Sequence, residues 1–127
     1  MRFQLIDQVL ERDDDRLVAV KNVTSAEEYL GDHFPGFPVL PGVMMLETLV
    51  QAARTLLDSR VDGPLILRQV RNVRYGNMVR PGQALRVEVT LRGEDGDGFD
   101  LNGVGKVDDQ VAVQGRFALC PLNQKKT

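Results

Sequence analysis

The sequence predicts a single α+β domain in which a curved antiparallel sheet of five to six strands wraps around one central helix, at about residues 42–59. Three observations support this prediction. Residues 43–59 have a helical hydrophobic period and contain no glycine or proline. Several valine-rich segments alternate apolar and polar side chains, as strands do. Short turns separate the last of these segments, so neighbouring strands should pair antiparallel.

The predicted central helix is apolar around most of its circumference. Pro41 and Gly42 stand where it should begin, because proline is favoured in the first turn of a helix. Its polar residues form only a narrow stripe, made of Glu47, Gln51, Thr55 and Asp58. A helix with so little polar surface has to be covered by other structure on most sides.

The remaining segments supply the predicted sheet. Strands are expected at residues 16–24, 64–75, 84–94, 98–108 and 110–120, whereas residues 3–11 fit either a strand or a short helix. Turns are expected at residues 12–16, 94–98 and 108–110, which are rich in aspartate and glycine or otherwise charged. Residues 25–32 fit a short helical turn that Ser25 could cap.

Composition and length exclude several classes of protein. The 127 residues suffice for one domain, expected at residues 1–122, with residues 123–127 as a disordered tail. A net charge of −2 argues against a protein that binds nucleic acid with its whole surface. One cysteine, Cys120, excludes an internal disulfide and fits the cytoplasm, and one cysteine with one histidine cannot form a structural zinc site. No signal peptide is expected, and no apolar stretch reaches the roughly twenty residues that span a membrane.

The segment HFPGFPVLPGVMMLE, from His33 to Glu47, contains the only histidine of the chain. Three prolines follow it at every third position, Pro35, Pro38 and Pro41. Such a pattern favours an extended backbone, and it could be a ligand for a proline-recognition domain. The residues between the prolines are glycine, phenylalanine, valine and leucine, whose side chains favour burial. We therefore interpret the segment as a rigid internal loop that leads into the helix.

Three groups of potential catalytic value lie in this loop or close to it along the sequence. The amide N–H groups at the helix start near Gly42 have no partner within the helix and could stabilise an oxyanion. Glu47 lies about one and a half turns further along, on the polar stripe. His33 would have to perform any imidazole acid–base chemistry. The alternative interpretations are a solvent-facing or capping glutamate and a structural histidine.

The longer segment GDHFPGFPVLPGVMMLETLVQAA resembles the signature of the FabZ-type 3-hydroxyacyl-[acyl-carrier-protein] dehydratases. In that family an acidic residue on the helix follows the histidine by fourteen positions, and His33 and Glu47 keep this spacing. The segments FQLIDQVLE, VAVKNVT and VRNVRYGNMVRPGQALRVEV also resemble the family, so the resemblance covers nearly the whole chain. Asp32 stands where the family usually has glycine.

The resemblance implies a hot-dog fold and a homodimer, which could assemble further into a trimer of dimers. Each active site would combine His33 of one subunit with Glu47 of the other. The implied reaction removes water from a 3-hydroxyacyl thioester in fatty-acid or related lipid or polyketide biosynthesis. His33 would take the C2 proton, Glu47 would orient or protonate the 3-hydroxyl, and the Gly42 N–H would polarise the thioester carbonyl. No cofactor or metal is implied, because the substrate is carried on the phosphopantetheine of acyl carrier protein.

Further site residues are expected around this centre. An acyl tunnel, for which ordinary core packing is the alternative, would be lined by Phe34, Phe37, Val39, Leu40, Met44, Met45 and Tyr75. Seven arginines but only two acidic residues lie between Arg60 and Arg92. Arginine suits acidic partners, so Arg74 and Arg80 are the candidates for binding acyl carrier protein. No nucleic acid or membrane partner is expected.

Two other functions remain compatible with the sequence. A hot-dog acyl-thioesterase would hydrolyse the thioester, although related thioesterases often use an acidic residue without a histidine such as His33. A non-catalytic subunit would bind acyl chains or pair with a catalytic partner.

Overall fold

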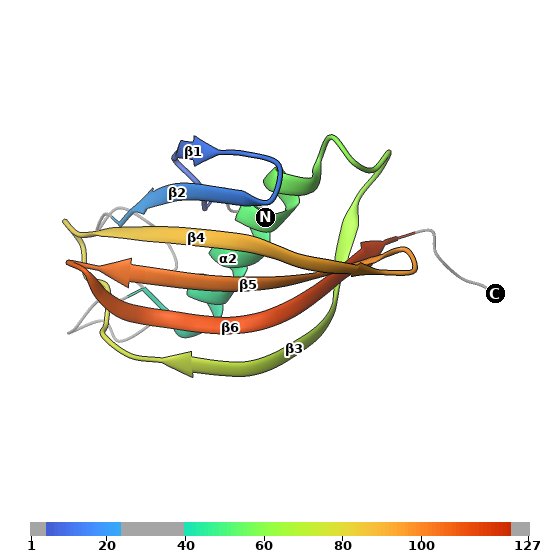
Figure 1. Ribbon diagram of the computed structural model, residues 1–127. Coiled ribbons are helices and arrows are strands. Elements are labelled where there is room, and N and C mark those ends of the chain that lie inside the picture. The colour runs from blue at the N-terminus through green and yellow to red at the C-terminus, as the bar shows by residue number, and fades with distance from the viewer. Residues whose placement is uncertain (1–4, 24–39, 123–127) are drawn as a thin grey trace.

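The computed structural model describes residues 5–23 and 40–122, so the expectations for residues 25–32 and 123–127 lie outside the described residues. The described part contains one helix and one six-stranded sheet (Figure 1). Its elements are β1 (Gln8–Arg12), β2 (Arg16–Asn22), α2 (Gly42–Leu57), β3 (Leu65–Tyr75), β4 (Ala84–Asp95), β5 (Gly98–Val107) and β6 (Gln110–Pro121). The strand order is β1-β2-β4-β5-β6-β3, and every neighbouring pair is antiparallel.

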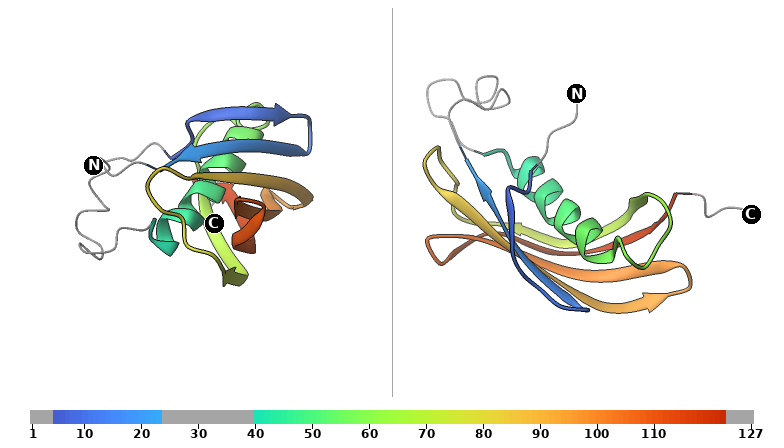
Figure 2. Two further views of the ribbon diagram at one scale, coloured as in Figure 1. Left: turned by 90° about the vertical axis from the view of Figure 1, so that its left-hand side faces the viewer. Right: turned by 90° about the horizontal axis from the view of Figure 1, so that it is seen from above.

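The sheet curves around α2, which lies on its concave side (Figure 2). Alternating residues of β4, Leu85, Val87 and Val89, are fully buried, because period-two side chains all point to the same face. Leu49 in the middle of the helix is also fully buried in this core. The prediction of a curved antiparallel sheet wrapped around one apolar helix is confirmed.

Two glycines of β5 let the sheet and the helix approach closely. A Cβ atom on Gly103 would lie 3.1 Å from both Leu49 Cδ1 and Phe117 Cε1. A Cβ atom on Gly105 would lie 2.9 Å from Val113 Cγ1. Both positions are buried, so any side chain there would displace the core packing.

Three details go beyond the sequence expectations. Residues 3–11 fitted a strand or a helix, and the described part of this segment contributes strand β1, whose five residues are all exposed. Helix α2 ends at Leu57, and the N–H of Asp58 donates to the carbonyl oxygen of Thr55 at 3.4 Å. The turn between β5 and β6 places Asp108 and Asp109 at φ values of 50° and 64°. Positive φ at both central residues suits the twist of a tight hairpin.

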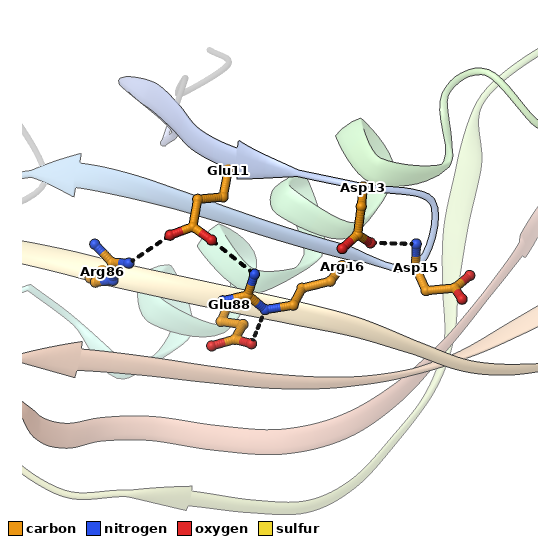
Figure 3. Close-up of polar contacts among 6 residues, drawn as sticks. All are labelled: Glu11, Asp13, Asp15, Arg16, Arg86 and Glu88. Atoms are coloured by element: carbon orange, nitrogen blue, oxygen red, sulfur yellow. Dashed lines mark hydrogen bonds and ion pairs between the residues drawn. The ribbon is translucent and has the colours of Figure 1, made fainter.

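A chain of charged side chains joins β1, β2 and β4 on the sheet face opposite the helix (Figure 3). Arg16 donates to Glu88 through Nε and to Glu11 through Nη1, the latter at 3.0 Å. Arg86 lies 3.5 Å from the other oxygen of Glu11. Hydrogen bonds to Glu88 first, and then to Glu11, raise the pKa of Arg16 above its ordinary value. Arg16 is therefore charged at every working pH.

Replacing Arg16 by glutamine is expected to lower the melting temperature at low ionic strength, with a smaller loss in high salt. Exposed ion pairs are screened over about 10 Å at 0.1 M salt, so the contribution of Glu88 and Glu11 should decline as salt is added. Thermal melts followed by circular dichroism at two salt concentrations measure this. Arg92→Gln, an exposed β4 arginine outside the network, is the control. If the melting temperature of Arg16→Gln fell by the same amount at both salt concentrations, an electrostatic role for Arg16 would be contradicted.

Candidate functional site

A pocket of about 1040 Å³ opens along the polar side of α2. Its apolar lining includes Leu5 and Ile6, which precede β1, together with Met44 on the helix and Leu65 at the start of β3. Its polar lining includes Glu47, Gln51 and Arg54, all from α2. The pocket therefore combines an apolar surface with a short row of hydrogen-bonding groups, which is the usual composition of a small-molecule site.

Glu47 is held in this pocket by a neighbour two helical turns away. Its side chain is 41% exposed, and Oε2 lies 3.4 Å from Arg54 Nη1. Arg54 Nε also donates to the carbonyl oxygen of Leu65 at 2.9 Å. Between them in sequence, Gln51 Oε1 accepts a hydrogen bond from the amide of Leu5 at 3.0 Å. These contacts attach the polar stripe of the helix to the two segments that flank the pocket.

The helix start has the geometry expected of an open amide donor. Pro41 is the N-cap residue, extended at φ −62° and ψ 147°, and Gly42 is the first helical residue. No acceptor among the described residues takes the Gly42 N–H. A Cβ atom at Gly42 would lie 3.0 Å from Tyr75 Cε1, so the Tyr75 ring lies directly against the helix start. Tyr75 itself is 52% exposed.

The remaining candidate residues near the helix do not all line the pocket. Met44 lines the same pocket as Glu47. Leu40 and Met45 are buried in the hydrophobic core, at 1% and 5% exposure. Four other candidates, His33, Phe34, Phe37 and Val39, lie outside the described residues.

The two candidate arginines line separate pockets. Arg74 belongs to a groove of about 610 Å³ that β3, β4, β5 and β6 line together. Arg80 lines a pocket of about 380 Å³ beside Asn77 and Gln83, and its amide donates to Gln83 Oε1 at 2.8 Å. A surface that used both side chains would have to extend over both pockets.

Comparisons with known proteins place the chain in a family. A family model described as ApeI-like, ApeI dehydratase, matches residues 9–116. The chain belongs to the ApeI-like dehydratase family.

Relatives of this ApeI-like dehydratase include proteins named 3-hydroxyacyl-[acyl-carrier-protein] dehydratase FabZ. The protein from Thermotoga petrophila is 38% identical over 92% of this chain and 85% of its own length. The protein from Solibacter usitatus is 34% identical over 98% of this chain and 78% of its own length.

Solved structures share the fold at lower identity. The dehydratase heterocomplex ApeI:P from Xenorhabdus doucetiae gives a TM-score of 0.78 at 22% identity, over 95% of this chain and 84% of that one. Protein PH1136 from Pyrococcus horikoshii gives a TM-score of 0.72 at 16% identity, over 94% of this chain and 85% of that one. The predicted hot-dog fold is confirmed, as is the prediction of an enzyme in a FabZ-like dehydratase family.

The described residues include no helix of the length and apolarity that crossing a bilayer requires.

Sequence reasoning did not assign Arg54 to the functional site of this ApeI-like dehydratase. Arg54 follows Glu47 by seven positions, and seven residues make almost two complete turns, so the two side chains share one helix face. That spacing was available in the sequence and could have placed Arg54 on the polar stripe. No local signal could have shown that Leu5 and Leu65 flank the same pocket, because their proximity depends on the whole sheet.

Proposed function

We propose that this ApeI-like dehydratase converts 3-hydroxyacyl thioesters, carried on the phosphopantetheine of acyl carrier protein, into trans-2-enoyl thioesters. The pathway would be fatty-acid or related lipid or polyketide biosynthesis in the cytoplasm, without a cofactor. The observation that carries the proposal is Glu47 in a large, partly apolar pocket on the helix that starts at Gly42. The names of the FabZ relatives support the choice of substrate.

In the proposed reaction, His33 accepts the proton from C2 and the C3–O bond breaks. The departing hydroxyl receives a proton from Glu47, directly or through water, and leaves as water. Proton exchange with solvent then restores both side chains. The Gly42 N–H donates a hydrogen bond to the thioester oxygen while that oxygen gains enolate character.

The expected magnitudes are sufficient for this division of roles. The C2 proton is weakly acidic, so stabilising the enolate oxygen is the largest requirement, and one well-placed donor contributes about 3 kcal/mol. Acid–base assistance adds roughly a hundred- to ten-thousand-fold in rate. The Gly42 amide, which has no acceptor among the described residues, and the pocket position of Glu47 support these roles.

The proposed active unit is a homodimer, in which His33 of one subunit meets Glu47 of the other. An exposed edge of the sheet supports this arrangement. Strand β3 is at the end of the strand order and has only β6 as a neighbour among the described strands. Its apolar residues Ile66, Leu67 and Val70 are 37–40% exposed. An edge strand that exposes apolar side chains favours pairing with a second chain.

A direct assay tests the reaction. Purified protein is incubated with 3-hydroxyacyl thioesters of acyl carrier protein and of coenzyme A, and the products are identified by mass spectrometry. Loss of one water from the thioester on acyl carrier protein is the expected result. Release of a free thiol would instead indicate a thioesterase, and acyl binding without turnover would indicate a non-catalytic subunit; either result would overturn the proposal.

Mixing two inactive variants tests the shared site. His33→Ala and Glu47→Gln chains are unfolded together, refolded and assayed. If each site takes one residue from each subunit, a heterodimer contains one intact site, and random pairing restores about a quarter of wild-type activity. Each variant refolded alone is the control. If His33 and Glu47 of the same chain formed the site, the mixture would stay as inactive as its components.

A further inference from the structure

Arg54 differs in charge from the other described residues that line the pocket. Among the described residues that line it, Arg54 is the only cation. Asp7, the other acidic residue there, has an oxygen engaged by the amide of Asn22 at 2.6 Å. The contact of Arg54 with Glu47 is therefore the one ion pair between pocket-lining residues in the described part of the chain.

The guanidinium of Arg54 is fixed by the sheet and not only by Glu47. Its Nε donates at 2.9 Å to the backbone carbonyl of Leu65, a strand residue that is 4% exposed. The planar guanidinium holds its nitrogens in fixed relative positions, so anchoring Nε also orients Nη1. Glu47 Oε2 lies 3.4 Å from that nitrogen. The carboxylate is thus connected through Arg54 to the first residue of β3.

This ion pair contributes little to stability. The side chains of Arg54 and Glu47 are 39% and 41% exposed, and pairs at such exposure contribute about 0–1 kcal/mol. Orientation is the larger effect, because displacing a reacting group by about 1 Å can reduce a rate by roughly a hundredfold. Among the described residues, none donates a hydrogen bond to the other oxygen, Oε1.

We propose that Arg54 is a positioning residue that holds Oε2 of Glu47 against the start of β3 and directs Oε1 toward the 3-hydroxyl of the substrate. The inference rests on the proposed function of Glu47. It assigns Arg54 no contact with the substrate. Its effect should therefore appear in turnover more than in substrate binding, and it should disappear when Glu47 can no longer act.

Arg54→Met is the main test variant, since methionine keeps an unbranched apolar stem without the guanidinium. We expect kcat to fall roughly ten- to a hundredfold with little change in KM. Arg54→Lys keeps the positive charge but loses the planar guanidinium. Its kcat should lie between those of the wild type and Arg54→Met. In a Glu47→Gln background, Arg54→Met should cause no further loss, because coupled residues are not additive.

The chain offers a matched control in Arg12. Its Nη2 contacts the carbonyl oxygen of Leu56 at 3.4 Å and Asp58 Oδ1 at 3.1 Å, so it also joins a carbonyl to a carboxylate. Arg12 does not line the pocket. Arg12→Met should leave kcat within about twofold of wild type, as expected for a surface substitution remote from the chemistry.

The outcomes separate this inference from the proposed function. Full kcat in Arg54→Met, or an equal further loss in the Glu47→Gln background, would overturn the positioning role while the dehydratase proposal stands. If the wild-type protein does not dehydrate the substrate, the proposed function fails first. A crystal structure of Arg54→Met gives a readout that needs no activity: a displaced Glu47 carboxylate supports the inference, and an unmoved one refutes it.

Discussion

Glutamine in place of Glu47 is expected to slow dehydration of the 3-hydroxyacyl thioester by about a hundred- to ten-thousand-fold. The amide keeps the size of the side chain but cannot deliver a proton to the departing hydroxyl. Folding should be little affected, because Glu47 is 41% exposed and its pairing with Arg54 is a partly solvated one. Steady-state kinetics on the acyl carrier protein substrate, with a thermal melt of each protein, measure both effects.

The same helix supplies a control for that experiment. Asp58 caps α2, is 62% exposed and pairs with Arg12, but it does not line the pocket. Asp58→Asn makes the same chemical change as Glu47→Gln and should preserve turnover. Equal activity in Glu47→Gln and wild type would remove Glu47 from the chemistry, and the assignment of the pocket would fail with it.

Leu49→Ala is expected to give the largest loss of stability, about 2–5 kcal/mol in the free energy of unfolding. Leu49 is fully buried, and its methyl groups lie against the β5 backbone at Gly103, which has no side chain to fill the space that they leave. The loss combines the lost burial of the methyl groups with the cost of a cavity. Urea unfolding followed by circular dichroism measures it.

Leu10→Ala is the matched comparison, because Leu10 in β1 is 41% exposed. Its expected cost is within about 0.5 kcal/mol, as for most surface substitutions. Both variants have to be compared at one protein concentration, since association with a second chain would make the apparent stability concentration-dependent. Similar losses for Leu10→Ala and Leu49→Ala would contradict the central position of α2.

Local periodicity accounts for the parts of the fold that the sequence predicted well. The helix expected at about residues 42–59 is found at Gly42–Leu57, because its apolar side chains repeat at the period of an α-helix. The strand expected at residues 84–94 is found at Ala84–Asp95, because its side chains alternate. Residues 3–11 carry a weaker pattern that also fits a helix, and pairing with β2 makes the end of this segment a strand.

The sequence by itself determined the helix, the alternating strands and the spacing from Gly42 to Glu47, since each depends on residues close together along the chain. Only the tertiary structure decided that Leu5, Glu47, Arg54 and Leu65 surround one pocket. It also placed the ring of Tyr75 against Gly42. Such contacts join segments that are far apart in sequence, and they follow from strand order and sheet curvature, which no local hydrophobic pattern specifies.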